Sequence, residues 1–496
     1  MPVISYFSFR FLLLLCLVPF VSPVASVETD LETEISRAIS EEALVGISWS
    51  IISDNQTSVG GAGFANVEQG LTMQSEQKIQ VGSVTKTVLA LGVLRLITED
   101  KLTLDTNVEL LLSKLTFYNP WRNSSPITVR HLLEHTAGID NIRMWQLLSE
   151  QPTPAMPLID AFISRDRHLL RVRTQPGTQY SYSNMGYTLL GMVIEAISNQ
   201  PYEEYLDRNF LAPLGMDNST FAFLSQKGEK ADPSLAMGYF ENQVAQSAVA
   251  TFLRPSTQFT TTAPDMARFM RFIMAHGELD GVAFIRGDLM EMLAKPNATD
   301  AFLAGLNLGH GLAFAVRDRH KVVGMCHPGT TYGFRAYLCL YPNENKGFFW
   351  AVNTDSETAD YERLNQIFIQ KLAVSQANVI KPSIAPDNLS EFAGMYFLSP
   401  NNMAQFEFID RLLNFIWLKS DNGELILSSL QAADRRLFSL GDGLFRDKSR
   451  TQASHVIFHN ETGDTLLSDG LNTFKKGSAK SIIFVSVRPS HLLFAD

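Results

Sequence analysis

The chain is poor in cysteine and in charge, and both shortages exclude classes of protein. Three of its 496 residues are cysteine, and only Cys326 and Cys339 remain once an N-terminal leader is set aside. Two cysteines are too few for a disulfide framework. They could form one bond across neighbouring strands or stay as reduced, buried thiols, and the sequence favours neither. Charged residues make up 19% of the chain, with a net charge of −10 and no long run of one sign, so we expect no nucleic-acid partner.

Long hydrophobic runs are also scarce, and the clearest one lies at the N-terminus. The apolar residues 11–20 follow Arg10 and precede small residues at 24–26. This order predicts a secretory signal over residues 1–26 and an exported protein, periplasmic or extracellular. An uncleaved anchor is the alternative, although two prolines shorten the run. We expect no transmembrane span beyond the signal, because the apolar residues 482–487 are too few to cross a bilayer.

The length of the chain predicts a large core and more than one domain. A segment with two prolines and no periodicity, residues 377–388, is expected to link a main domain over residues 27–376 to a smaller one. Beyond it, short alternating runs are separated by turns such as Asp421-Asn422-Gly423. This pattern predicts an all-β, barrel-like domain over residues 389–478, followed by a tail over residues 479–496.

The main region carries patterns of both strands and helices. Alternating or short apolar runs predict strands over residues 45–52, 58–67, 311–316, 321–326, 337–340 and 347–352. Helical spacing predicts helices over residues 31–42, 88–97, 128–138, 185–194 and 357–376. The irregular stretches between these elements are typical of the walls of a cleft in a secreted enzyme.

The segment Val81-Gly82-Ser83-Val84-Thr85-Lys86-Thr87 holds a candidate nucleophile and its base. Gly82 and Ser83 indicate a strand-to-helix turn, with Ser83 at or beside the N-cap of an apolar helix. Lys86 lies three residues later on nearly the same helix face, so its amine stands beside the hydroxyl. Burial and the positive helix end both favour a neutral amine, which can accept the proton of the serine.

The Ser-x-x-Lys pattern alone is a weak signal, because a second match occurs at Ser75 to Lys78. That match lies in a polar segment with no apolar helix after it, which predicts a solvated loop or a strand edge. The competing interpretation of Ser83 is an N-cap followed by a surface lysine, with no catalytic role.

Two later segments supply further candidate groups. Tyr182 and Asn184 lie two residues apart in a tight loop and point to one side if the loop is extended. A phenol buried near Lys86 would act as a phenolate or as a proton relay, whereas the alternative is a core tyrosine with a bonded hydroxyl. The segment His327-Pro328-Gly329-Thr330 follows a predicted strand, where the glycine admits a close approach and the Thr330 amide can donate.

A different chemistry is suggested by His131, Glu134 and His135. Two histidines four residues apart share a helix face, and the glutamate between them could act as a base beside a zinc ion. The predicted helix is short, begins at an N-cap threonine, ends at Gly138 and has no obvious third ligand. We therefore expect structural histidines and no metal, and keep a zinc peptidase as the alternative.

Three motifs occur in a fixed order: Ser-x-x-Lys at 83–86, Tyr-Ser-Asn at 182–184 and His-x-Gly at 327–329. With them the chain resembles the serine β-lactamase and penicillin-binding-protein superfamily over about residues 31–376. Its nearest branch is the class C β-lactamase-like group of D,D-carboxypeptidases, D-aminopeptidases and esterases. The resemblance extends to framework segments at residues 131–138, 176–178 and 213–216.

The resemblance implies an α+β fold, in which an antiparallel sheet is flanked by helices and a helical subdomain, and it implies roles for the motif residues. Ser83 would attack a carbonyl and form an acyl-enzyme, while Lys86 and Tyr182 share the proton transfers. Asn184 would hold Lys86 and meet the substrate amide. The Ser83 and Thr330 amides would form the oxyanion hole. His327, with Gly329 after it, stands where many relatives have lysine, and would orient the substrate carboxylate or the tyrosine hydroxyl.

The expected function is therefore that of a cofactor-independent serine hydrolase acting on a peptide, amide or ester carbonyl. A D-amino-acid peptide is the first expected substrate, as for a D,D-carboxypeptidase, and the alternatives within the fold are a carboxylesterase and a β-lactamase. A non-catalytic binding module is the alternative from another class. The expected partner is a small-molecule or peptide substrate, and the sequence indicates no oligomeric state. The segment 254–262 lacks the glycines usual before the next helix, which points to an altered cleft wall.

Overall fold

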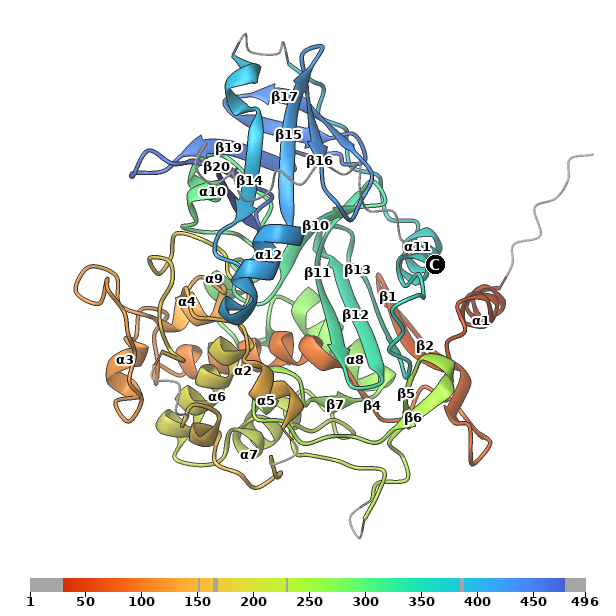
Figure 1. The fold of residues 1–496 in the computed structure, drawn as a ribbon. Helices are drawn as coiled ribbons and strands as arrows, with labels where there is room; N and C mark the ends of the chain where they lie inside the picture. Colours follow the sequence, from red (N-terminus) through yellow and green to blue (C-terminus); the bar gives the residue numbers. More distant parts are fainter. Residues whose placement is uncertain (1–29, 150–151, 164–167, 229–230, 384–387, 478–496) are drawn as a thin grey trace, which may run out of the picture.

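A computed structural model describes residues 30–149, 152–163, 168–228, 231–383 and 388–477 (Figure 1). The predicted signal over residues 1–26 and the predicted tail over residues 479–496 lie outside the described residues. Within the described residues, no helix is both long enough and apolar enough to span a membrane.

A seven-stranded antiparallel sheet forms the centre of the main domain, in the order β10-β11-β12-β13-β1-β2-β3. Its strands are β10 Ala315–Arg319, β11 Val322–Thr331, β12 Phe334–Tyr341, β13 Lys346–Val352, β1 Gly46–Ser53, β2 Gln56–Asn66 and β3 Leu71–Thr72. Strands from the two ends of the domain meet where β1 pairs with β13, with Trp49 opposite Trp350. This antiparallel sheet with flanking helices confirms the predicted fold class.

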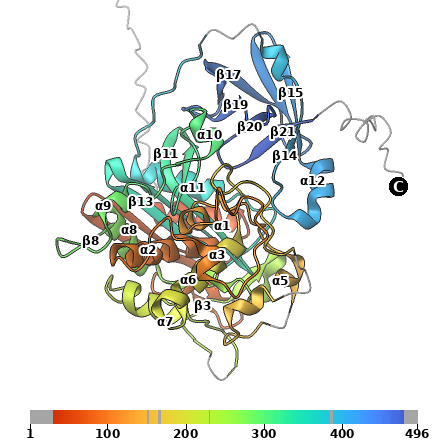
Figure 2. The same cartoon turned by 90° about the vertical axis from the view of Figure 1, so that its left-hand side faces the viewer.

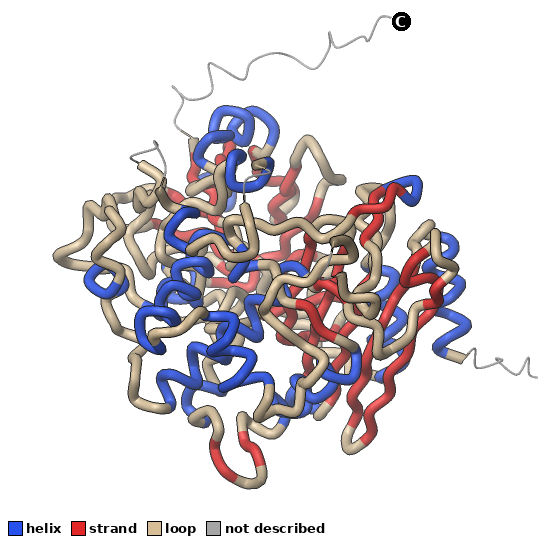
Figure 3. The backbone as a smooth tube through the Cα atoms, turned by 90° about the horizontal axis from the view of Figure 1, so that it is seen from below, coloured by secondary structure: helices blue, strands red, loops and turns tan. Residues whose placement is uncertain are grey.

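The side chains of each central strand alternate between two helical layers, as the period of two requires. On β13, Phe348 and Trp350 pack with α1 (Leu31–Glu41) and α11 (Glu362–Leu372), whereas Phe349 and Ala351 face the larger core on the other side. Figure 3 shows the strands with helices on either side.

The larger core contains two long helices that carry the catalytic candidates, α2 (Thr85–Thr98) and α6 (Asn184–Ser198). Nearly every residue of α2 is buried, as expected for a helix that is apolar on all sides. Helix α8 (Ala263–Met274) packs beside β1 and β13. The shorter helices are α3 Val108–Leu111, α4 Val129–Leu133, α5 Met144–Leu148, α7 Tyr202–Leu206, α9 Gly287–Met290 and α10 Asp300–Leu303. Three small sheets pair β4 Ile79–Gln80 with β7 Thr260–Thr261, β5 Gly238–Phe240 with β6 Val244–Gln246, and β8 Glu278–Leu279 with β9 Val282–Ala283.

The C-terminal strands form a closed eight-stranded barrel, which confirms the predicted barrel-like domain. The strands are β14 Gly394–Leu398, β15 Phe415–Asp421, β16 Glu424–Ser428, β17 Arg435–Gly441, β18 Leu444–Asp447, β19 His455–His459, β20 Thr465–Ser468 and β21 Thr473–Lys476. The predicted turn between β15 and β16 has positive φ at Asn422 (48°) and Gly423 (80°), the conformation that a tight hairpin needs. Figure 2 shows the barrel on one side of the helices and the large sheet.

Several predicted boundaries were wrong, among them those of the helix predicted over residues 357–376, which spans only Glu362–Leu372. Residues 311–314 are not a strand, because their backbone bonds the segment at Met292 and Leu293 and β10 begins only at Ala315. The helix at 128–138 ends at Leu133, where His135 rather than Gly138 takes the first left-handed conformation (φ 57°). The segment from His327 to Thr330 does not follow a strand but belongs to β11 itself.

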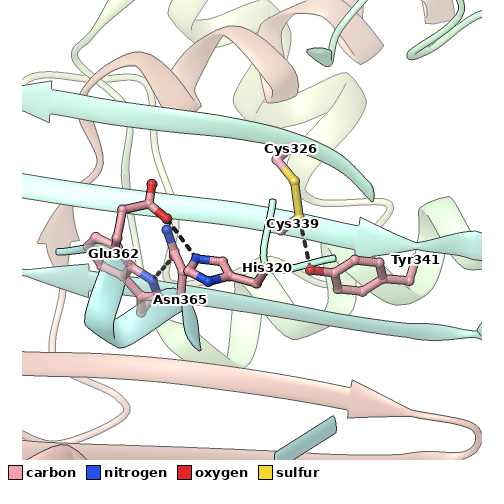
Figure 4. The surroundings of a disulfide bond; sticks show 7 residues. His320, Cys326, Cys339, Tyr341, Glu362 and Asn365 are labelled. Carbon is pink, nitrogen blue, oxygen red and sulfur yellow. Dashed lines mark hydrogen bonds and ion pairs between the residues drawn. A yellow bond between two sulfur atoms is a disulfide. The ribbon is translucent and has the colours of Figure 1, made fainter. Parts of the chain in front are cut away.

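Cys326 and Cys339 form a disulfide bond, which decides between the two alternatives left open by the sequence. They lie directly opposite each other on β11 and β12, with the Tyr341 hydroxyl 3.5 Å from the Cys339 sulfur (Figure 4). The bond therefore joins the strand that carries His327 to the middle of the sheet.

Candidate active site

Ser83 lies in a short 3-10 turn, η1 (Gly82–Val84), between β4 and α2. Gly82 has a φ of 51°, and a Cβ atom there would lie 2.5 Å from backbone atoms of Thr330. Glycine is therefore required for both the conformation and the close approach. The turn packs against β11, and this contact places Ser83 beside the edge of the sheet.

Lys86 is fully buried, and its Nζ lies 3.0 Å from Ser83 Oγ. Two oxygens accept from the same amine, Asn184 Oδ1 at 2.8 Å and the Ser256 carbonyl at 2.8 Å. Burial lowers the pKa of Lys86 well below its ordinary value, which favours the neutral amine. A neutral amine has two N–H groups and one lone pair. Since two oxygens take the N–H groups, the lone pair is left for the hydroxyl proton of Ser83.

Tyr182 donates its hydroxyl to Ser83 Oγ at 2.7 Å. Burial raises the pKa of Tyr182, and the hydrogen bond to Ser83 opposes this rise only in part. The phenol therefore stays protonated near neutral pH. Of the two states considered from the sequence, this arrangement favours a proton donor over a phenolate.

Asn184 begins α6, whose N-cap Ser183 accepts from the Gly186 amide. Its backbone N and its Nδ2 both donate to Asn141 Oδ1, at 3.1 and 2.8 Å. These two bonds fix the orientation of the side-chain amide, so that its oxygen faces Lys86. Asn141 and the Ser256 carbonyl were missed from the sequence. A lone asparagine in a loop has no recognisable spacing, and a backbone acceptor has no residue-type signature.

Strand β11 presents a free edge next to Ser83. Its pairing with β10 ends at Cys326, whereas its pairing with β12 continues to Thr331. Pro328 faces away from β12, so its missing N–H costs the β11–β12 pairing no hydrogen bond. Its carbonyl accepts from His327. Thr330, two residues further on, faces the same way, so its amide points to the free edge where η1 lies. A Cβ atom at Gly329 would lie 3.1 Å from the Ser83 amide nitrogen, so the Ser83 and Thr330 amides lie close together.

His327 is connected to the site through a series of ring contacts. Its Nδ1 donates to the Pro328 carbonyl at 2.7 Å, and its ring lies edge-on to His310, with 6.1 Å between centroids. The chain of rings continues to His135 at 5.1 Å and from there to Tyr182 at 4.4 Å. Burial lowers the pKa of all three histidines, that of His310 to about 4, so the cluster is neutral. In the described part of the chain, His327 makes no hydrogen bond to Ser83, Lys86 or Tyr182, and its predicted orienting role stays a prediction.

The residues of the alternative zinc motif make structural contacts. His131 Nδ1 accepts from the Thr128 amide, and Thr128 Oγ1 accepts from the His131 amide, which closes the start of α4. His135 Nδ1 accepts from the Ser183 amide at 3.1 Å, and Glu134 pairs with the Arg130 guanidinium at 3.2 Å. Across the described ranges, no three His, Cys, Asp or Glu side chains are placed to hold a metal ion together. These contacts favour the structural interpretation.

A cavity of about 250 Å³ lies at Ser83 and Asn184. Ile142, Leu147 and Leu253 give it apolar walls, and threonines and Tyr332 give it polar ones. Of the described residues that line it, Asp355 has the one charged side chain, and the Arg335 guanidinium pairs with that carboxylate at 2.7 Å. The cavity therefore offers uncharged side chains that can donate or accept hydrogen bonds, and one carboxylate that is already paired with an arginine.

Comparison with known proteins points to one family. The family described as Beta-lactamase matches residues 30–370. Protein flp of Staphylococcus aureus (strain MRSA252) is 23% identical over 334 residues, or 66% of this chain and 64% of that protein. The chain thus spans less than two thirds of the length of this relative. Penicillin-binding protein 4* of Bacillus subtilis (strain 168) is 21% identical over 368 residues, or 69% of this chain and 77% of that protein.

Solved structures share the fold over most of the chain. A crystal structure of SurE with D-Leu superposes with a TM-score of 0.61 at 21% identity, and covers 90% of this chain and 98% of its own. The octameric penicillin-binding protein homologue from Pyrococcus abyssi gives a TM-score of 0.56 at 22% identity, and covers 90% of this chain and 99% of its own. At such identities the likeness concerns the fold alone.

Proposed function

Because the chain belongs to the beta-lactamase family, we propose that it is a serine hydrolase that cleaves an amide or ester through an acyl-enzyme on Ser83. The observation that carries this proposal is the surroundings of the Lys86 amine. Two carbonyl-type oxygens occupy its N–H groups, and its lone pair is left for the Ser83 hydroxyl at 3.0 Å. A buried amine held in this way is a base already directed at its nucleophile.

The proposed reaction begins when Ser83 Oγ attacks the substrate carbonyl carbon and passes its proton to Lys86. The negative charge that forms on the carbonyl oxygen is stabilised by the Ser83 and Thr330 amides, each expected to contribute about 3 kcal/mol. As the bond to the leaving group breaks, Tyr182 protonates the departing nitrogen or oxygen. Lys86 then returns its proton to the Tyr182 phenolate, so that both groups regain their starting states while Ser83 Oγ stays bonded to the acyl group. In the second half, water attacks the acyl carbon and the same groups act in reverse.

A D-amino-acid peptide is the proposed substrate. The Bacillus subtilis relative is named a penicillin-binding protein, and a solved structure of the same fold is described with D-Leu. Asn184 supports this proposal, because its position beside Lys86 also lets it meet a substrate amide.

A carboxylesterase is the second candidate, and the state of His327 favours it. Where many relatives carry a lysine, this chain has a histidine whose pKa is lowered by burial, so it is neutral. The charged side chain among the described cavity-lining residues is the carboxylate of Asp355. A substrate carboxylate would therefore meet no fixed positive charge from these residues, and a neutral ester would fit the cavity without that loss.

A substrate panel tests both candidates. Chromogenic esters, D-alanyl peptides and β-lactams are offered to the full chain and to Ser83→Ala, with turnover and intact mass measured for each. The proposal expects an acyl adduct on the wild type and none on Ser83→Ala. Faster turnover of D-alanyl peptides supports the peptidase and faster turnover of esters supports the esterase. Turnover that survives Ser83→Ala would contradict a serine hydrolase of either kind.

We also propose export of the chain, on the pattern of residues 1–26. Sequencing the N-terminus of the mature protein tests this proposal. We expect the mature protein to begin close to residue 27, and a protein that begins at Met1 would contradict cleavage.

A further inference from the structure

The connection between β14 and β15 leaves the barrel and lies against the main domain. It contains a 3-10 turn, η8 (Ala404–Phe406), and a helix, α12 (Glu407–Leu413), which Figure 1 shows between the barrel and the helices below it. Asn401 Oδ1 accepts from Arg173 at 2.8 Å, and Gln405 Oε1 accepts from the Met144 amide at 3.3 Å. The Ala404 amide donates to both oxygens of Asp140, at 3.0 and 3.2 Å.

Asp140 is a buried charge at the centre of this contact, with 1% of its surface exposed. Arg143 lies 2.9 Å from one carboxylate oxygen and Arg173 lies 3.3 Å from the other. A buried carboxylate is stable only when its lone pairs are taken up by donors and its charge is balanced. The Ala404 amide is one of these donors, and it comes from the barrel domain.

Hydrogen bonds connect Asp140 to the catalytic residues. Its Oδ1 accepts from the Asn141 amide at 3.0 Å, and its carbonyl accepts from the Ser183 hydroxyl at 2.7 Å. Asn141 in turn accepts both donors of Asn184, whose oxygen holds Lys86. A continuous series of hydrogen bonds thus joins the barrel domain to the base of the active site.

We propose that the C-terminal barrel is a positioning element of the active site, and that the Ala404 amide, by fixing Asp140, sets the orientation of Asn141 and so of Asn184 toward Lys86. The proposal rests on the proposed function, since it concerns the rate at which Ser83 is acylated. Ala404 touches neither substrate nor reacting atoms, and its part is played by a backbone group.

Ala404→Pro is the direct test, because the local backbone accepts proline. Ala404 is the first residue of η8, and Met403 before it is extended (φ −135°, ψ 109°), both of which suit an X-Pro pair. The substitution removes the N–H and places the ring Cδ against Asp140. Acylation of Ser83 in the full chain by a fluorophosphonate probe, followed by intact mass, is expected to slow about tenfold. Ala404→Ser keeps the N–H and is expected to stay within about twofold of the wild type. Thermal unfolding of each variant reports whether the fold is kept.

A double-mutant cycle with Asn141→Ala separates positioning from a general loss of structure. If residue 404 acts through Asn141, Ala404→Pro in the Asn141→Ala background is expected to slow acylation by less than about twofold. Asn401→Ala loosens the same connection through Arg173 and serves if Ala404→Pro does not fold. It is expected to slow acylation about threefold, and again only when Asn141 is present.

The outcomes separate the positioning role from the proposed function. A wild-type chain that is not acylated at Ser83 would contradict the proposed function. A wild-type chain that is acylated, with folded Ala404→Pro and Asn401→Ala variants reacting at the same rate, would overturn the positioning role alone. If Ala404→Pro slows acylation as much in the Asn141→Ala background as in the wild type, the positioning role would be overturned as well.

Discussion

The chain contains the pattern Ser-x-x-Lys twice within twelve residues, and the two copies have different surroundings. Lys78 keeps 23% of its side chain exposed and pairs with the Asp232 carboxylate at 2.8 Å. Lys86 is fully buried and meets two neutral oxygens and the Ser83 hydroxyl. A carboxylate partner stabilises an ammonium ion, whereas burial among neutral acceptors favours the amine.

The difference arises from the segment that each copy leads into. The residues after Ser75 form a turn that leaves Lys78 partly exposed, and only then the chain enters a short buried strand, β4. The residues after Ser83 enter α2, which is buried over nearly its whole length. The same pattern therefore becomes an ion pair in one place and a nucleophile with its base in the other. The environment, rather than the pattern, creates the chemistry.

Removing the two hydroxyls should give the largest contrast. Ser83→Ala deletes the nucleophile and is expected to lower the acylation rate by a factor of about 10⁴ or more. Ser75→Ala is the matched control and is expected to leave the rate within about twofold. Intact mass after reaction with a fluorophosphonate probe, with the labelled peptide identified, measures both. Label on Ser75, or equal labelling of the two variants, would remove the distinction between the copies.

Removing the two amines should give the next contrast. Lys86→Met deletes the base at similar size and is expected to slow acylation by a factor of about 10³, within the range for general bases. Lys78→Met breaks a partly exposed ion pair and is expected to cost less than about 1 kcal/mol of stability, with the rate unchanged. Single-turnover kinetics and thermal unfolding measure the pair. An active Lys86→Met variant would show that another group takes the proton of Ser83.

The third contrast concerns the phenol of Tyr182, which lies beside the Ser83 copy of the pattern. Tyr182→Phe removes the proton donor 2.7 Å from Ser83 Oγ, and is expected to slow turnover by a factor of about 10². Tyr180→Phe, two residues away and likewise half-buried, is the control and is expected to stay within about threefold. A panel of leaving groups sharpens the test, because a lost proton donor should matter most for basic leaving groups. An equal effect on all leaving groups would contradict the donor role.

The smallest expected effect is on the way the free energy of unfolding changes with pH. The pKa of Lys86 in the fold is lowered by burial below its ordinary value of 10.5, so the unfolded chain binds one more proton between these two values. The stability of the wild type relative to Lys86→Met should therefore rise as pH increases through that window toward 10.5, by at most about 1.4 kcal/mol per pH unit. Denaturant unfolding of the wild type and Lys86→Met at several pH values measures the difference, and parallel curves would contradict a neutral Lys86.

The sequence predicted the reacting residues of the site better than it predicted the residues that hold them in place. Ser83, Lys86 and Tyr182 stand in spaced motifs whose residue types suit the reaction, and the structure joins all three by hydrogen bonds. Asn184 was predicted to hold Lys86, and it lies 2.8 Å from the amine. Spacing within each motif places its residues together at a helix start, and the resemblance to a known superfamily indicated that the two motifs meet.

The residues that support these groups could not be predicted in the same way. Asn141 and Asp140 act through hydrogen bonds with residues far away in sequence, and the Ala404 amide acts through its backbone. His310 joins the histidine cluster from the position just before the segment 311–316, which was predicted to be a strand and becomes one only from Ala315. Pairing between the domains depends on tertiary packing, which local patterns do not encode.

The protonation state of Lys86 is the claim on which the account depends, and ¹⁵N NMR of the lysine side-chain nitrogens at pH 7 tests it directly. Lys86→Met and Lys78→Met assign the two signals. The account predicts the chemical shift of a neutral amine for Lys86 and that of an ammonium ion for Lys78. An ammonium signal from both residues at pH 7 would contradict it.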